Sequence, residues 1–228
     1  MNIAIIVAAG KGARAGGGEA KQFRALAGVP LIIHTLRRFE QSATVGETVA
    51  VVPADATANF LALAGQYDLK KLARVVAGGE TRTESVWRGL KTVRAATAGV
   101  VAVHDGVRPF VTAEEIDACV RAAAESGAAV LAAPVVDTIK VVEGAHVAHT
   151  LPRETLRRAL TPQCFRYELL RRAYEHALAE KIETTDDSAL VELIGARVAV
   201  VEGDARNIKI TRPEDFALAE VLLKEKRP

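Results

Sequence analysis

The chain has 228 residues, half of them hydrophobic and a quarter charged, and its 30 basic and 28 acidic side chains leave a net charge of +2. This balance excludes a global field that would recruit nucleic acid, and no apolar run approaches the length of a membrane span. The two cysteines, Cys119 and Cys164, lack metal-type spacing, and no basic leader precedes the first strand, so we expect a cytoplasmic protein without structural disulfides.

Apolar runs rich in valine and isoleucine alternate with helical patterns along the chain. Strands are expected near residues 3–8, 47–52, 73–76, 100–104, 128–133 and 197–201. Helices are expected near residues 31–41, 56–66, 83–96, 113–126, 167–181, 186–194 and 213–225. This alternation indicates an α/β fold in which helices cover both faces of a mostly parallel sheet. We expect residues 1–228 to form a single domain with one appendage.

The appendage is expected at residues 135–155, where the alternation breaks. Two strand-like stretches meet at Glu143-Gly144, which is typical of a hairpin. An isolated hairpin is marginally stable in water. We therefore predict a protruding β-arm that packs against a second copy of the chain and makes a homodimer. The alternative is an additional antiparallel edge on the main sheet.

A glycine-rich basic loop follows the first strand. Gly10 and Gly12 lead to Arg14, three consecutive glycines come next, and Lys21 closes the loop. Glycines let backbone N–H groups approach phosphate oxygens, and the two cations add charge, so we expect this loop to wrap a triphosphate. The alternative, a flexible surface loop, does not explain why cations bracket the glycines.

The same loop matches the dinucleotide-binding pattern G-x-G-x-x-G/A, which ends at Ala15. That pattern needs a helix to begin at its third small residue, and glycines at positions 16–18 would each cost about 1 kcal/mol in a helix. A P-loop does not fit either, because Gly10-Lys11 is not followed by Ser or Thr. An NAD-dependent dehydrogenase is therefore disfavoured.

Polar residues also follow two later strands. Gly78-Gly79 with Ser85 suits edge-on recognition of a flat ring, and Asp105 with Arg108 suits a hydroxyl-bearing or metal-bridged anionic ligand. Each pattern has a structural alternative. The glycine pair can be a plain turn, and the Asp105–Arg108 pair can serve only to fix its own turn.

Lys209 stands in a short strand-like run, 207–211, between two isoleucines that point to the other face, which favours a fixed position in a cleft. Thr211 and Glu214 have the spacing of a capping box for the last helix. The five histidines are too scattered for a metal site, and we interpret them as structural or exposed.

Six blocks in a fixed order resemble a known family. They are Ala8-Ala-Gly-x-Gly-x-Arg14 with Lys21-Gln22, Gly78-Gly79 with Ser85, His104-Asp-x-x-Arg-Pro109, Asp137-Thr-x-Lys140, Leu160-Thr-Pro-Gln163 and Asn207-Ile-Lys-x-Thr211. Together they resemble the 2-C-methyl-D-erythritol 4-phosphate cytidylyltransferases, a family of sugar-phosphate cytidylyltransferases, over nearly the whole chain. The resemblance implies a Rossmann-like nucleotidyltransferase fold, a homodimer with interlocked arms, CTP with Mg²⁺, and cytidylyl transfer in the non-mevalonate isoprenoid pathway.

The resemblance also assigns site residues. Arg14 and Lys21 match the pair that stabilises the transition state, and Arg153 and Lys209 match the pair that positions the substrate phosphate. The residues that match CTP contacts are Ala8, Ala9, Gly10, Gly12, Gly79, Glu80, Ser85 and Gly106. The residues that match contacts to methylerythritol phosphate are Asp105, Arg108, Thr138 and Thr161. No side chain is implied as a dedicated metal ligand, because the ion is held mainly by the oxygens of the triphosphate.

The chain departs from the family pattern at a few positions. Its loop is unusually rich in glycine, Ala13 replaces a common second arginine, and Glu80 replaces an expected aspartate. None of these changes removes a catalytic group. A cytidylyltransferase for ribitol 5-phosphate or another pentitol phosphate is the alternative activity. A regulatory nucleotide-binding module without turnover is disfavoured, because all four cationic positions are filled.

Overall fold

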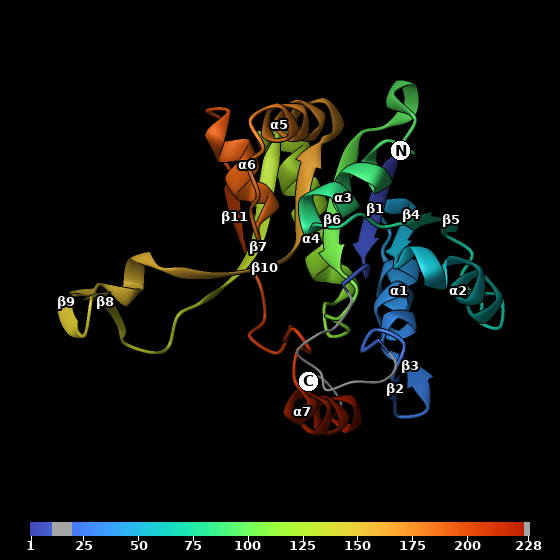
Figure 1. Cartoon of the computed structure of the whole chain (residues 1–228), viewed down its shortest axis with the longest axis horizontal. Helices are drawn as coiled ribbons and strands as arrows, with labels where there is room; N and C mark the ends of the chain where they lie inside the picture. Colours follow the sequence, from blue (N-terminus) through green and yellow to red (C-terminus); the bar gives the residue numbers. More distant parts are fainter. Residues whose placement is uncertain (11–19, 226–228) are drawn as a thin grey trace.

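The computed structural model describes residues 1–10 and 20–225. At its centre lies a seven-stranded sheet in the order β11-β7-β10-β6-β1-β4-β5 (Figure 1). Its strands are β1 (Asn2–Val7), β4 (Val45–Val52), β5 (Leu72–Ala77), β6 (Val100–Asp105), β7 (Ala128–Pro134), β10 (Arg157–Arg166) and β11 (Ala199–Glu202). Within this sheet β10 alone runs antiparallel to its neighbours. The prediction of a mostly parallel sheet is confirmed.

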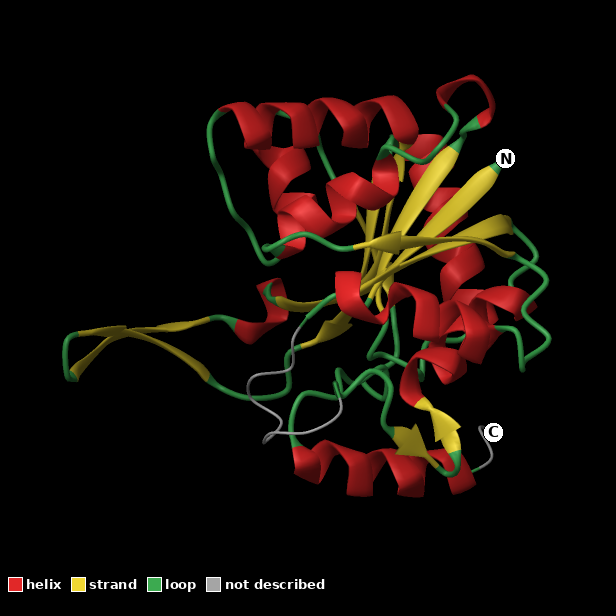
Figure 2. Cartoon of the chain, turned by 45° about the vertical axis from the view of Figure 1, so that its right-hand side comes forward, coloured by secondary structure: helices red, strands yellow, loops and turns green. Residues whose placement is uncertain are grey.

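Helices cover both faces of the sheet (Figure 2), as predicted. They are α1 (Leu31–Gln41), α2 (Thr57–Ala64), α3 (Arg82–Leu90), α4 (Ala113–Ser126), α5 (Tyr167–Ala179) and α6 (Asp187–Leu193), with short 3-10 turns at η1 (Ala54–Ala56) and η2 (Ala95–Thr97). The helix expected over residues 83–96 therefore ends early, at Leu90. No helix in the described part of the chain is long and apolar enough to cross a membrane.

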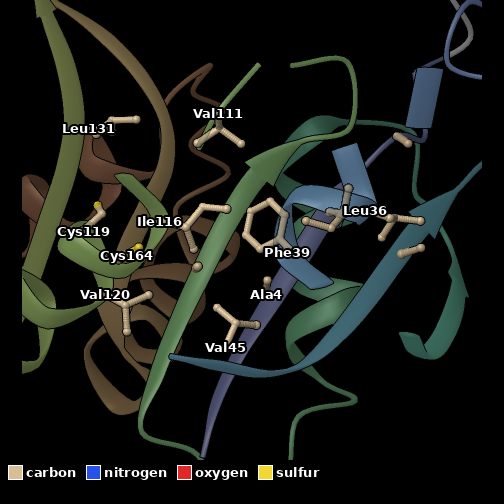
Figure 3. Packing of buried hydrophobic residues seen from close by; sticks show 14 of the residues in the cluster. Ala4, Leu36, Phe39, Val45, Val111, Ile116, Cys119, Val120, Leu131 and Cys164 are labelled. Carbon is tan, nitrogen blue, oxygen red and sulfur yellow. The ribbon is translucent and has the colours of Figure 1, made fainter. Parts of the chain in front are cut away.

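The alternation of side chains along β1 explains the two layers. Ala4 and Ile6 pack in one cluster with α1, α2 and α4, whereas Ile3 and Ile5 pack in a second cluster with α3, α5 and α6. Figure 3 shows the first cluster around Phe39, which is completely buried. Burial of each large side chain of this kind contributes about 1.5–3 kcal/mol to folding.

Strand β10 was not predicted from the sequence. Its centre holds Pro162, which has no N–H to donate to the ladder, beside the polar residues Thr161 and Gln163. The pairing with β7 shifts register between Ala159 and Gln163, so the proline lies in an irregular stretch of the strand. A bulge of this kind re-aims side chains, and it leaves Thr161 beside the end of β6.

The predicted hairpin forms an arm that projects from the sheet (Figures 1 and 2). It consists of β8 (Ile139–Glu143) and β9 (His146–Leu151), followed by the 3-10 turn η3 (Arg153–Thr155). These strands pair with each other in a two-stranded sheet of their own, so the alternative of an additional edge on the main sheet is wrong. Val136, Val142 and Val147 of the arm are exposed.

A third layer lies beyond the carboxyl ends of the strands (Figure 1). The small hairpin β2 (Ala25–Leu26) and β3 (Val29–Pro30) packs there with α7 (Pro213–Lys224) around an apolar cluster. The run 207–211 is not a strand. The predicted capping box of Thr211 and Glu214 is also wrong, because Asp215 accepts the backbone N–H groups of Thr211 and Arg212 instead.

Candidate active site

The ends of β1, β5 and β6 meet at one edge of the sheet. The backbone N–H of Gly78 donates to Val52 and that of Gly106 to Val7, both at 2.8 Å, so each turn closes onto the neighbouring strand. A Cβ atom at Gly78 would lie 2.1 Å from the Cβ of Ala9. The two loops therefore approach so closely that only glycine fits, and this closeness brings predicted nucleotide-binding residues together.

Gln22 fixes the beginning of the glycine-rich loop. Its buried Nε2 donates to the carbonyl oxygens of Ala8 at 2.8 Å and Gly10 at 3.1 Å. Lys21 precedes this anchor directly in the chain. Gly12 and Arg14 lie outside the described residues. The sequence motif included Gln22, but its role as an anchor depends on contacts that spacing does not reveal.

The turn after β5 leads directly into α3. Ser85 Oγ accepts the N–H of Gly79 at 3.0 Å and donates to the carbonyl of Thr81 at 2.8 Å. The N–H of Glu80 donates to Glu84 at 2.8 Å. These bonds hold the backbone groups of residues 78–80 in one orientation beside the end of β1.

Asp105 ends β6 and lies almost completely buried among cations. Its Oδ2 is 3.0 Å from Lys209 Nζ and 3.1 Å from Arg108 Nε, and its Oδ1 is 3.9 Å from Arg82 Nε. Burial by itself would raise the pKa of Asp105, but the charges of Lys209, Arg82 and Arg108 hold this pKa well below its usual range. The carboxylate is thus ionised and engaged by three cations.

Arg82 is a site residue that the sequence analysis missed. Its guanidinium binds Asp187 through two bonds, at 2.8 Å and 2.5 Å, while its Nε faces Asp105. Asp187 is completely buried and also accepts the Tyr174 hydroxyl. Arg82 stood in a polar block after β5, but its partner is 105 residues away in the chain, so spacing gave no signal of the pair.

Two contacts fix the segment that carries Lys209. Arg108 Nη1 donates to the carbonyl of Asn207, and Asn207 Nδ2 donates to the carbonyl of Thr161, both at 2.8 Å. The side chain of Lys209 nevertheless remains 41% exposed. Its ammonium therefore contacts Asp105 and can still be reached by a ligand from solvent.

His104 lies behind Asp105 and is completely buried. Its Nδ1 is 2.9 Å from Thr161 Oγ1, and its Nε2 is 3.1 Å from the carbonyl of Arg108. Burial lowers the pKa of His104 to about 4, so the imidazole is neutral at physiological pH. The structural interpretation of this histidine was correct as far as burial goes, but it overlooked the direct bond to a predicted site residue.

Comparisons with known proteins identify the family of this chain. The family model "IspD: 2-C-methyl-D-erythritol 4-phosphate cytidylyltransferase" matches residues 2–225. A cytidylyltransferase of that name from Halalkalibacterium halodurans is 46% identical over 222 residues, which cover 97% of this chain and 96% of the relative. The chain belongs to the IspD family.

Solved IspD structures share the fold. The 4-diphosphocytidyl-2C-methyl-D-erythritol synthase of Anaerococcus prevotii superposes with a TM-score of 0.87 at 30% identity, covering 98% of this chain and 96% of that one. The Thermus thermophilus cytidylyltransferase superposes with a TM-score of 0.78 at 35% identity, covering 99% and 100%. The family and the fold predicted from the six sequence blocks are confirmed.

Two predicted site residues lie on the arm, away from the carboxylate of Asp105. Thr138 precedes β8, and Arg153 begins η3, so both belong to the projecting arm (Figure 2). Arg153 Nη1 donates to the carbonyl of Val136 at 3.0 Å, and its guanidinium pairs with exposed Glu154. The structure brings Asp105, Arg108, Thr161 and Lys209 together within one chain.

The buried His104 predicts a defined pH dependence of stability. The unfolded chain binds its proton below about pH 6.5 and the folded chain only below about pH 4, so stability falls as pH decreases through this window. We expect the difference in free energy of unfolding between the wild type and His104→Gln to shrink by about 2 kcal/mol between pH 7 and pH 4.5. Urea unfolding of both proteins at a series of pH values measures this difference.

The comparison between the two proteins isolates His104. The pKa of His34 is also lowered by burial, but that residue is present in both proteins and cancels in the difference. The depressed pKa of Asp105 acts in a separate window, because its contribution is lost only below the unfolded value of 3.8. Identical pH slopes for the two proteins would contradict a neutral buried His104.

Proposed function

We propose that this chain transfers the cytidylyl group of CTP to 2-C-methyl-D-erythritol 4-phosphate, releasing pyrophosphate and 4-diphosphocytidyl-2-C-methyl-D-erythritol, in the non-mevalonate isoprenoid pathway. The supporting observation is the convergence of Lys209, Arg108 and Arg82 on Asp105, beside the glycine-lined end of β1. The three cations exceed the two carboxylates, Asp105 and Asp187, by one charge. An excess of positive charge at this sheet edge suits a phosphate monoester next to a triphosphate.

The reaction then needs no side-chain nucleophile. A phosphate oxygen of the substrate attacks the α-phosphorus of CTP in line, and pyrophosphate leaves. A phosphate monoester is already an anion near neutral pH, so the main obstacle is repulsion between two anions and the charge that develops on the transferred group. Lys209 and Arg153 would position the attacking phosphate, and Arg14 and Lys21 would stabilise the developing charge.

The nucleotide would lie across the ends of β1 and β5. Backbone groups of Ala8, Ala9, Gly10, Gly12 and Gly106 would approach the ribose and phosphates, and Gly79, Glu80 and Ser85 would read the base edge. The N–H groups of Gly79 and Glu80 donate to Ser85 and Glu84, and these bonds fix the shape of the turn, which supports this assignment. Methylerythritol phosphate would contact Asp105, Arg108, Thr138 and Thr161.

Mg²⁺ fits this site as a companion of the triphosphate. In the described part of the chain, no group of three or more His, Cys, Asp or Glu side chains is arranged to hold a metal ion. The carboxylate of Asp105 is already engaged by cations. When bound to the phosphate oxygens, the ion would offset their negative charge, and the protein would contribute its own cations around it.

The arm supports a shared active site. Its exposed valines and its projection from the sheet favour packing against a second subunit. Thr138 and Arg153 would then reach the site of the partner subunit.

We further propose that residues 1–228 form one catalytic domain with an arm at about 135–155, and that the protein is located in the cytoplasm.

Pyrophosphate release tests the activity. We expect release from CTP to require 2-C-methyl-D-erythritol 4-phosphate, and to be slow with ribitol 5-phosphate.

Lys21→Ala should lower kcat by about 10²–10³, because it removes a charge directed at the transition state. The exposed Lys70, which pairs with Asp68, supplies the matched control Lys70→Ala with unchanged kcat. Faster turnover of ribitol 5-phosphate would reassign the substrate, and normal turnover by Lys21→Ala would refute the role of Lys21.

Base selection provides a second test. If residues 78–85 read the pyrimidine edge, a purine is too large for the site and leaves its polar groups unpaired, so ATP and GTP should be poor donors. Competition between CTP and ATP in the same assay measures this selectivity. Equal use of both nucleotides would contradict the assignment of the turn after β5 to the base.

Mixed dimers test the shared site. Chains carrying Lys21→Ala and chains carrying Arg153→Ala are each expected to be inactive, but one site in every mixed dimer would have both residues intact. Random exchange makes about half of the dimers mixed, so recovery should approach about a quarter of wild-type activity.

The control mixture combines Lys21→Ala with Lys209→Ala. These two residues would serve the same site from one chain, so this mixture should recover no activity. If subunit exchange is demonstrated and the first mixture also stays inactive, Arg153 acts in the site of its own chain and the shared-site model is wrong.

A further inference from the structure

One imidazole links three parts of the substrate side of the site. His104 is the penultimate residue of β6, and the ring of Phe39 packs edge-on against it with 5.0 Å between centroids. On one side its Nδ1 contacts Thr161 of β10, and on the other its Nε2 contacts the carbonyl of Arg108. The ring is fixed in position by packing and by both of its nitrogens.

These contacts determine which atom donates each hydrogen bond. A carbonyl oxygen only accepts, so His104 Nε2 carries the hydrogen that it shares with Arg108. In a neutral imidazole Nδ1 is then an acceptor, and the Thr161 hydroxyl must donate to it at 2.9 Å. The backbone N–H of Asp105 donates to the same Thr161 Oγ1 at 3.2 Å. The single hydroxyl hydrogen of Thr161 is thus committed, and one lone pair remains.

We propose that His104 is a positioning residue that holds the Thr161 hydroxyl as a hydrogen-bond acceptor, so that Thr161 receives a bond from a hydroxyl group of the polyol and gives none to its phosphate. This inference deepens the proposed function and depends on it. The side chains around the substrate then divide into two kinds. Asp105 and Thr161 accept from hydroxyl groups, whereas Lys209 and Arg108 donate to anionic oxygens. The polyol end and the phosphate end of the substrate are distinguished by this division.

Steady-state kinetics with both substrates test the proposal. His104→Gln can place its amide near Nε2 and keep the bond to Arg108, but it loses the acceptor for Thr161. We expect its KM for 2-C-methyl-D-erythritol 4-phosphate to rise about tenfold, the size of one lost hydrogen bond, with the KM for CTP changed less than twofold. His104→Asn can place its amide oxygen near Nδ1, so its effect should be smaller.

Thr161→Val tests the same relay without changing the buried histidine. It keeps the shape of the side chain but removes the hydroxyl, so it should raise the KM for the polyol phosphate about as much as His104→Gln. The double variant should have the same KM for the polyol phosphate as Thr161→Val alone, because both substitutions disrupt the same Thr161–His104 hydrogen bond. Thr161→Ser should restore the wild-type KM.

His34→Gln is the matched control. His34 also has a ring nitrogen bonded to a backbone carbonyl, that of Leu26 at 2.8 Å, but this bond lies outside the site. We expect both KM values of this variant to stay within twofold of wild type.

A KM for the polyol phosphate that is unchanged in Thr161→Val would overturn the proposal, as would KM increases that add in the double variant. So would equal rises of both KM values, which indicate general disruption.

Deoxy analogues keep the test valid if His104→Gln fails to fold. One of these analogues lacks the hydroxyl that faces Thr161. We expect the kcat/KM of the wild type for this analogue to be about tenfold lower than for the parent compound. Thr161→Val should use the analogue and the parent compound equally. If Thr161→Val discriminates among the analogues as wild type does, the inference is wrong. Absence of any turnover by wild type would instead refute the proposed function itself.

Discussion

The ionised carboxylate of Asp105 is the constraint on which the site depends. Removing a carboxylate from water costs several kcal/mol unless charges and hydrogen bonds replace the lost solvation. Lys209, Arg108 and Arg82 supply that replacement from the segment after β11, the turn after β6 and the first turn of α3. Because each cation comes from a different part of the chain, the charge holds three segments against the sheet edge.

The same arrangement keeps the cations available. Three positive groups close together repel one another, and without a central anion they would separate into solvent. Asp105 offsets part of this repulsion, and Asp187 holds Arg82 from the opposite side. Lys209 remains 41% exposed, so its charge stays accessible from solvent. The carboxylate therefore fixes cations in advance, which lowers the cost of organising them around an anionic substrate.

Much of this architecture could be predicted from local patterns. The run that ends at Val7, the glycines at 78 and 79, and the polar turn from Asp105 predicted which strand ends lie together at one edge of the sheet. The side-chain alternation around Lys209 predicted a fixed position for this residue, and its Nζ lies 3.0 Å from Asp105 Oδ2. Strand β10 was missed because Pro162 interrupts its pattern, although β6 and β7 pair with it on both sides. The Arg82–Asp187 pair was missed because its partners are remote in the chain.

The missed strand explains how one edge of the sheet can serve two kinds of ligand group. In a purely parallel sheet, β6 and β7 would present only loops at this edge, whereas antiparallel β10 runs past the end of β6 and places the Thr161 hydroxyl beside Asp105. An irregular stretch in β10 aims that hydroxyl at His104, and the carbonyl of Thr161 accepts Asn207 from the Lys209 segment. The bulged strand therefore connects the acceptor side of the site to its cationic side.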